Sequence, residues 1–219
     1  MFRQYRKIEK GEFILCAVDT SSGGADFTTG QFLSKTKLDV PLVFQSKTTA
    51  ADFIPLLCRT LEAIFDITGI KPVVALERNN GGAFLMDRVA ALNLLGKYVV
   101  FLMPTYGKTD AGESKRYGWD TNSATRPKML QDLKDVMDKR MVKIYDRPTL
   151  QECLSFIIVQ TSSSWKAQAE KNSHDDLVMA LAIVWQMYQI CNPEQSAKKD
   201  YSKYENYKQD AYNKNGLYL

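Results

Sequence analysis

The sequence predicts an α/β fold built on one mixed sheet, partly antiparallel and partly parallel, with helices flanking it. Three short apolar segments between residues 13 and 46 are separated by turn residues, which is typical of an antiparallel meander. After residue 49, apolar segments of strand length alternate with segments of helical periodicity, which indicates parallel strands joined by helices. The 219 residues, 45% of them apolar, are enough for one domain with a substantial core.

The first half of the chain is expected to form the meander, one helix and a buried strand. Strands are predicted at 13–19, 28–34 and 40–45, each bounded by turn residues. A helix is predicted at 49–67, because six apolar residues recur there at helical intervals and a glycine follows. The five apolar residues that open the segment 72–77 predict a buried strand.

The second half alternates between helices and strands. A tight glycine-containing loop precedes a predicted helix at 83–95, and a strand at 98–103 is ended by a proline. The polar segment 105–126 reads as a long loop, and loops of this length are usually functional or disordered. The remaining expected elements are a helix at 126–140, a strand at 142–145, a helix from about 148, a hairpin of 156–160 and 165–170, and a helix at 175–191.

The domain is expected to span residues 1–195, followed by a tail at 196–219. The tail is rich in tyrosine and lysine and poor in aliphatic residues, so it cannot bury much core and is expected to be mobile. The four cysteines are far apart and lie in apolar surroundings, which indicates reduced core residues. No secretory signal or membrane-spanning segment is recognisable, so a membrane protein is not expected.

Composition excludes several enzyme classes. His174 is the only histidine, which excludes H-E-x-x-H hydrolases, histidine-rich zinc sites and nucleases that need a histidine base together with histidine ligands. The sequence has no phosphate-binding G-x-x-x-x-G-K-[ST] motif, so it is not a P-loop ATPase on its own. A net charge of +4 is compatible with nucleic-acid binding but does not establish it.

Acidic residues stand at the ends of three apolar elements. Asp19 ends the strand predicted at 13–19, Glu77 ends the strand predicted at 72–77, and Asp175 and Asp176 open the last helix. A buried carboxylate stays ionised only if it is paired, hydrogen-bonded or bound to a metal. Carboxylate oxygens favour Mg²⁺ or Mn²⁺. The pattern therefore predicts a metal site.

Each acid also has a purely structural interpretation. Asp19 could begin a turn, Glu77 could pair with Arg78, and Asp175 is a natural helix N-cap. Asp176 is expected on the inward face of its helix, which capping does not explain. Taken together, the acids favour two-metal phosphodiester hydrolysis, in which two ions roughly 3.5–4 Å apart are held by carboxylates from distant parts of the chain.

The order of these motifs resembles the nuclease domain of large terminase subunits from tailed bacteriophages, which has a ribonuclease H-like fold. The resemblance covers about residues 10–192. Its motifs are Val18-Asp19 with a glycine turn, Leu76-Glu77-Arg78-Asn79, Gly118-Trp119-x-Thr121-x-x-x-Thr125-Arg126, and His174-Asp175-Asp176-Leu177-Val178-Met179-Ala180.

The resemblance implies a Mg²⁺- or Mn²⁺-dependent endonuclease that cuts concatemeric viral DNA during packaging. The expected catalytic residues are Asp19, Glu77, Asp175 and Asp176, and the expected ligands of the two ions are Asp19, Glu77 and Asp176. The expected partners are double-stranded DNA, a terminase ATPase domain and a capsid portal. The expected location is the cytoplasm of the infected bacterium. The ATPase domain is not in this sequence, which suggests an excised domain or a separately encoded half.

Basic and aromatic residues in the loop at 105–126 suggest where DNA binds. Lys108, Lys115 and Arg116, here called the basic loop cluster, are predicted to contact phosphates together with Arg126. The aromatic residues among them would pack on sugars or bases; they are Tyr106, Tyr117 and Trp119. The alternative is a solvated loop in which Trp119 anchors the chain in the core.

Two other functions remain open from the sequence. One is another ribonuclease H-like nuclease, acting on four-way junctions or RNA–DNA hybrids, since an acidic cluster does not itself select a substrate. The other is a non-catalytic DNA-binding packaging module that keeps the fold.

Overall fold

The protein is described here from a computed structural model. It describes residues 1–21, 26–79, 81–103, 116–160, 165–169 and 174–193, and within these ranges the side chains of residues 50, 116, 156–160 and 165–169 are not described. The tail predicted at 196–219 therefore lies outside the described residues.

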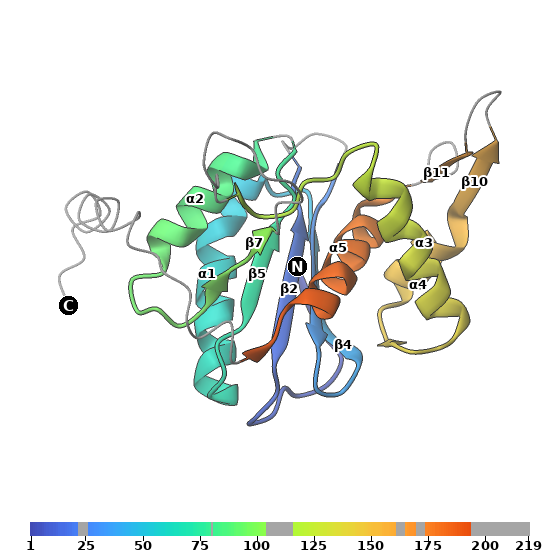
Figure 1. Ribbon diagram of the computed structural model, residues 1–219. Coiled ribbons are helices and arrows are strands. Elements are labelled where there is room, and N and C mark those ends of the chain that lie inside the picture. The colour runs from blue at the N-terminus through green and yellow to red at the C-terminus, as the bar shows by residue number, and fades with distance from the viewer. Residues whose placement is uncertain (22–25, 80, 104–115, 161–164, 170–173, 194–219) are drawn as a thin grey trace, which may run out of the picture.

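A mixed sheet forms the centre of the molecule (Figure 1). Its strand order is β1-β4-β3-β2-β5-β6, and β9 also pairs with β4. The meander of β2, β3 and β4 is antiparallel, whereas β5 lies parallel to β2 and β6 parallel to β5. The strands are β1 (Phe2–Gln4), β2 (Ile14–Asp19), β3 (Thr28–Ser34), β4 (Asp39–Ser46), β5 (Val73–Leu76), β6 (Val99–Val100) and β9 (Lys143–Ile144). The predicted mixed sheet, with its meander and parallel strands, is confirmed.

Helices cover both faces of the sheet (Figure 1). Helices α1 (Ala50–Thr68) and α2 (Gly82–Leu92) pack on one face, and α3 (Thr125–Asp138) and α5 (Asp176–Ile190) pack on the other. Helix α4 (Arg147–Ser155) precedes a two-stranded hairpin of β10 (Phe156–Gln160) and β11 (Trp165–Ala169). The hairpin was also predicted from the sequence.

The alternation of side chains along the central strands assigns each residue to one of the two cores. In β2, Leu15 and Ala17 join the core beneath α3 and α5, whereas Ile14, Cys16 and Val18 join the core beneath α1 and α2. In β5, residues 73 and 75 likewise face α5, and residues 74 and 76 face α1 and α2. This period of two is the direct consequence of strand geometry, and it decides where the next side chain of each strand points.

Helix α5 is buried on all sides. Every residue from Leu177 to Met187 is buried, which explains why the sequence from Leu177 to Trp185 is continuously apolar rather than amphipathic. The helix packs against β2 and β3 (Figure 1). Its N-terminus is thereby held near the end of β2.

Two predicted elements are built differently in the structure, and one short strand was not predicted. The strand predicted at 98–103 is divided into β6, which extends the main sheet, and β7 (Leu102–Met103). Part of the predicted loop at 105–126 is strand β8 (Arg116–Tyr117), which pairs antiparallel with β7. Such pairing is set by residues distant in sequence, so local patterns did not reveal it. Strand β1 was also not predicted, because it is only three residues long.

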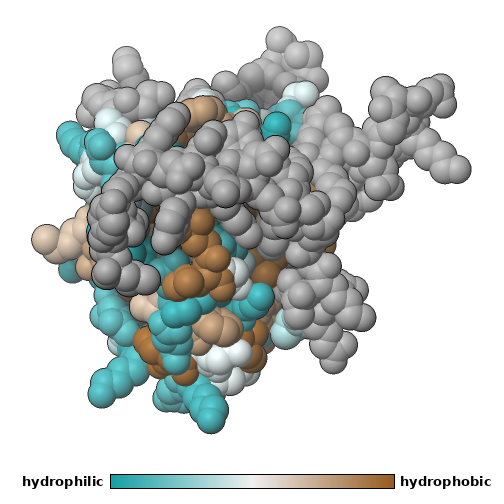
Figure 2. All heavy atoms as spheres, turned by 90° about the vertical axis from the view of Figure 1, so that its left-hand side faces the viewer, coloured by the Kyte–Doolittle hydropathy of each residue, from teal (hydrophilic) through white to brown (hydrophobic). Residues whose placement is uncertain are grey.

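Helix α2 ends at Leu92 instead of residue 95. The Asn93 side chain is buried and its Nδ2 donates to Tyr98 O at 2.7 Å, so the chain turns away from the helix at this point. Leu94 and Leu95 then lie exposed. The face with α1 and α2 carries apolar patches among hydrophilic ones (Figure 2), and Leu56 and Phe84 are exposed side chains of these helices.

The four cysteines are free thiols, as predicted, and three of them are buried. No helix in the described part of the chain is long and apolar enough to cross a membrane.

Candidate acidic site

The ends of β2 and β5 bring two carboxyl groups together on the α5 side of the sheet. Val18 is paired with Leu76 across the parallel strands, and Glu77 N donates to Val18 O at 2.8 Å. Asp19 and Glu77 each follow the residue that faces α1 and α2, so the period of two turns both side chains toward α5. The meeting of Asp19 and Glu77, predicted from the sequence, is therefore seen in the structure.

Both carboxyl groups are buried, and they share a hydrogen bond. Asp19 is 9% exposed and Glu77 is 6% exposed. Burial raises the pKa of Asp19 well above its usual 3.8, and the adjacent Glu77 raises this pKa further through its charge and a hydrogen bond to the protonated Asp19. The charges of Asp176 and Asp175 act in the same direction. Like charges in a buried site repel one another, so this group of acids favours a partner that neutralises them.

Helix α5 supplies the third carboxyl group. The Oδ2 atom of Asp176 accepts a hydrogen bond from Phe27 N at 3.2 Å and lies 3.7 Å from His174 Nδ1. Burial raises the pKa of Asp176, and Asp175 raises it further, against the lowering effect of the Phe27 amide. The Asp176 side chain is 16% exposed and that of Asp175 is 33% exposed, in agreement with the expected inward placement of Asp176.

Asp175 occupies the N-cap position of α5 but does not cap the helix with its side chain. Instead its Oδ2 pairs with Arg126 Nη2 at 2.9 Å, which joins the first turns of α3 and α5. Asp175 is therefore the N-cap residue, as the structural interpretation expected, but its side chain does not make the capping hydrogen bond.

The carboxyl groups are close but are not arranged as a ready-made ligand set. Among the residues that the structure describes, no three His, Cys, Asp or Glu side chains form a group that could hold a metal ion. The reason is visible in the contacts: Asp19 bonds to Glu77, Asp176 turns to the Phe27 amide, and Asp175 turns to Arg126. The chemistry of the donors nevertheless fits a hard divalent ion, because buried carboxyl groups that repel one another are stabilised by a cation.

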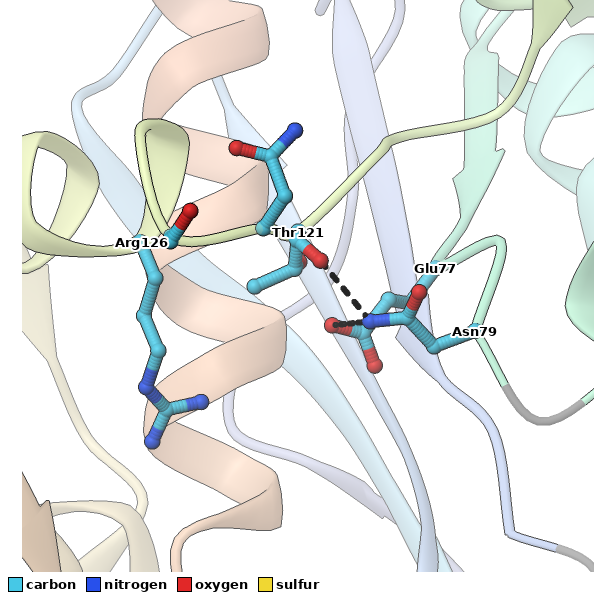
Figure 3. Close-up of a pocket in the computed structure, with 6 residues that line it drawn as sticks. Glu77, Asn79, Thr121 and Arg126 are labelled. Atoms are coloured by element: carbon cyan, nitrogen blue, oxygen red, sulfur yellow. Dashed lines mark hydrogen bonds between the residues drawn. The ribbon is translucent and has the colours of Figure 1, made fainter.

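A polar hollow of about 560 Å³ opens beside Glu77 (Figure 3). Asn79 Nδ2 donates to Glu77 Oε1 at 3.4 Å and to Thr121 O at 3.0 Å, which ties the end of β5 to the segment before α3. Arg126 lies across the hollow from Glu77 (Figure 3). The hollow is lined by Glu77, Asn79, Thr121, Asn122, Ser123 and Arg126.

The predicted aromatic contacts to DNA are wrong for Tyr117 and Trp119. Tyr117 is 4% exposed and Trp119 is 5% exposed, each within one of the two cores. Trp119 N donates to Leu76 O, and Arg78 N donates to Trp119 O, so this segment continues the edge of β5. Trp119 is anchored in the core, as the alternative interpretation expected, whereas the solvated part of that loop lies outside the described residues. Arg78 pairs with Asp120 at 2.7 Å and not with Glu77.

The predicted phosphate-binding residues are only partly described. Tyr106, Lys108 and Lys115 lie outside the described residues, and of Arg116 only the backbone is described. Arg126 stands at the first turn of α3, beside the hollow and paired with Asp175. Of this predicted set, Arg126 is the member that the structure places beside the acidic site.

Glu152 of α4 belongs to the same region and was not identified from the sequence. Its Oε2 accepts hydrogen bonds from Leu177 N at 2.8 Å and Val178 N at 3.4 Å. Burial raises the pKa of Glu152 from 4.5 to about 7, and the charges of Asp176 and Asp175 add to this. No local signal marks it, because an acid near the end of an amphipathic helix is ordinary.

No protein-family model and no curated protein matches this sequence. Solved structures do match. The large terminase nuclease from thermophilic phage G20c with bound magnesium has a TM-score of 0.58 and 19% identity, over 84% of each chain. This is the fold of large terminase nuclease domains. The P22 large terminase nuclease domain matches with a TM-score of 0.51 and 14% identity, over 90% of this chain and 92% of that one. The human cytomegalovirus terminase nuclease domain matches at 0.57 and 10%, over 85% and 86%. The ribonuclease H-like fold expected from the motifs is confirmed.

Proposed function

We propose that this protein is a divalent-metal-dependent endonuclease that cuts duplex viral DNA during genome packaging. The observation that carries the proposal is the buried pair of Asp19 and Glu77, which faces Asp176 at the N-terminus of α5. The fold adds support, because three solved structures that share it are terminase nuclease domains, one of them with bound magnesium.

Asp19, Glu77 and Asp176 are the residues that would hold the metal, with Asp175 beside them. When bound, a pair of Mg²⁺ or Mn²⁺ ions supplies charge stabilisation to a phosphodiester and a water of lowered pKa. Asp19 ends the central strand and interacts with both Glu77 and Asp176, so it would be the member of this set that could serve both ions. Because burial and Glu77 raise the pKa of Asp19, binding of a metal would be accompanied by loss of a proton from this site.

Other residues of the chain would hold the substrate. Arg126 is the cation among the residues that line the hollow, and its guanidinium could donate two parallel hydrogen bonds to a DNA phosphate there. Binding a phosphate there would compete with its present partner, Asp175. Asn79 keeps Glu77 in place through its amide. The basic loop cluster would extend this surface along the DNA backbone, as expected from the sequence.

The proposal includes the partners and the location expected from the resemblance. They are double-stranded DNA, a terminase ATPase domain, the capsid portal and the cytoplasm of the infected bacterial host. No motor activity is proposed for this chain.

The function is tested by incubating the purified protein with supercoiled plasmid, RNA–DNA hybrid and a four-way junction, each with Mn²⁺, with Mg²⁺ and with EDTA. We expect metal-dependent cutting of the plasmid and little action on the other substrates. Cutting of the hybrid or the junction in preference to the plasmid would support another ribonuclease H-like nuclease. Metal-independent DNA binding without cutting would support a non-catalytic packaging module.

A further inference from the structure

Two buried polar side chains and one half-buried carboxyl group surround the first turn of α5, outside the acidic site itself. Thr29 and Gln31 come from β3 and Glu152 comes from α4; together they are called the α5 clasp. Thr29 and Gln31 are fully buried. All three bond to the backbone of residues 176–178.

The clasp makes hydrogen bonds to both the carbonyl oxygens and the amide groups of the peptide bonds that follow Asp176. Thr29 Oγ1 donates to Asp176 O at 2.8 Å, and Gln31 Nε2 donates to Leu177 O at 3.3 Å. Glu152 Oε2 accepts from Leu177 N at 2.8 Å and Val178 N at 3.4 Å. The backbone on the C-terminal side of Asp176 is therefore fixed by three side chains from two other elements.

Glu152 makes the capping hydrogen bonds that the N-cap residue of α5 does not make. The first amides of a helix have no partner within it, and the side chain of the N-cap residue usually accepts from one of them. The N-cap of α5 is Asp175, but its carboxylate pairs with Arg126 and makes no capping bond. Glu152 accepts from two of these amides instead, so the start of the helix is capped while Asp175 pairs with Arg126.

We propose that Glu152 is a positioning residue for the acidic site, which holds Asp176 where it completes the metal-binding set with Asp19 and Glu77. The inference rests on the proposed function, because it assumes that Asp176 is a metal ligand. Residues that orient a ligand without touching the metal commonly change metal affinity by roughly 10-fold to 100-fold when they are replaced. Glu152 acts here through a backbone contact and not through its charge.

Two variants separate these contributions. Glu152→Gln keeps a side-chain oxygen in the place of Oε2 and removes the charge, whereas Glu152→Ala removes the acceptor. Mn²⁺ binding to the whole chain is measured by isothermal titration calorimetry, well below the melting temperature. We expect Glu152→Ala to weaken Mn²⁺ binding by about 10-fold or more and Glu152→Gln to bind close to the wild-type affinity.

Lys35 provides the matched control. Its Nζ donates to Tyr188 O at 2.8 Å and Cys191 O at 2.6 Å, so it caps the other end of the same helix. At 1.5 Å per residue, the 15 residues of α5 place this contact about 22 Å from the site. Lys35→Met is expected to lower the melting temperature and to leave Mn²⁺ affinity unchanged, which distinguishes positioning of Asp176 from general loss of stability.

If folded Glu152→Ala binds Mn²⁺ with wild-type affinity, the inference about Glu152 is overturned but the proposed function is not. Binding by Glu152→Gln as weak as that of Glu152→Ala would also overturn it, since the charge and not the hydrogen bond would then be required. If Glu152→Ala does not fold, Thr29→Val removes the donor to Asp176 O with little change of shape, and unchanged Mn²⁺ affinity in this variant overturns the inference. No Mn²⁺ binding by the wild type would overturn the proposed function together with this inference.

Discussion

Gly82, the first residue of α2, lies directly against the backbone of Glu77, so replacing it tests whether Glu77 must stay in place. A Cβ atom at this position would stand 1.7 Å from Glu77 O, 2.8 Å from Glu77 C and 3.3 Å from Thr20 Oγ1. Since Cβ contacts below 3.0 Å essentially do not occur, Gly82→Ala requires Glu77 O and Gly82 to move apart by at least 3.0 − 1.7 = 1.3 Å.

The expected cost follows from two opposing effects. Overpacking usually costs about 1–3 kcal/mol, and the obstacle here is main chain, so a value of about 3 kcal/mol is appropriate. Alanine instead of glycine in a helix returns about 1 kcal/mol. The net loss in the free energy of unfolding is therefore about 2 kcal/mol. A shift of about 1 Å in a catalytic group can reduce the rate by about 100-fold, so a loss of that size is expected in plasmid cleavage.

Gly81→Ala is the matched control. Gly81 has φ = +85° and nothing within 4 Å of the added Cβ, so alanine there costs about 1–2 kcal/mol of backbone strain without touching Glu77. Urea denaturation and Mn²⁺-dependent plasmid cleavage are measured for both variants. We expect similar losses of stability, but a loss of cleavage only in Gly82→Ala. Near wild-type cleavage by Gly82→Ala, or an equal loss in both variants, would refute the reasoning.

Three further predictions concern the acids and the loop. Asp176→Asn should reduce cleavage more than Asp175→Asn, because Asp176 lies deeper and Asp175 is paired with Arg126; single-turnover rates in the reverse order would show that the wrong acid was chosen. As the pH rises from 5 to 8, the stability of Glu152→Gln relative to the wild type should increase by about 1–2 kcal/mol. A pKa raised from 4.5 to about 7 implies roughly 3 kcal/mol, and solvent screening reduces this value. The wild type becomes less stable as pH rises, because Glu152 loses its proton at a lower pH in the unfolded chain than in the folded one. A stability difference between the two proteins that does not change with pH would contradict this prediction. Alanine at all three positions of the basic loop cluster should make DNA binding less dependent on salt. The slope of log binding constant against log salt concentration should fall in magnitude by roughly 0.9 for each phosphate that the variant no longer binds. An unchanged slope, measured on catalytically inactive protein, would show that DNA binds elsewhere.

The core of the site could be predicted because strand geometry is local. An acid that follows an apolar strand keeps the alternation of that strand, so Asp19 and Glu77 had to emerge on definite faces of the sheet. Likewise, the apolar segment after Asp176 could only be a buried helix. These features depend on residues near one another in the sequence.

The remaining features depend on contacts between distant segments. Trp119 looked available to DNA because its loop is polar, but backbone pairing along the edge of β5 carries it into the core. Glu152 acquires its role only when α4 is packed against the start of α5. The contact between Gly82 and Glu77 O is equally invisible in a sequence that shows only two adjacent glycines.

Cleavage of supercoiled plasmid in Mn²⁺ by the wild type and by Asp19→Asn is the most direct test of the acidic site. The asparagine removes a buried group whose pKa is raised by burial and by Glu77, so the variant should fold at least as stably as the wild type. We expect the wild type to cut the plasmid and folded Asp19→Asn to leave it intact, with the same result for Glu77→Gln. Cleavage by Asp19→Asn at a rate near that of the wild type would contradict the assignment of this site.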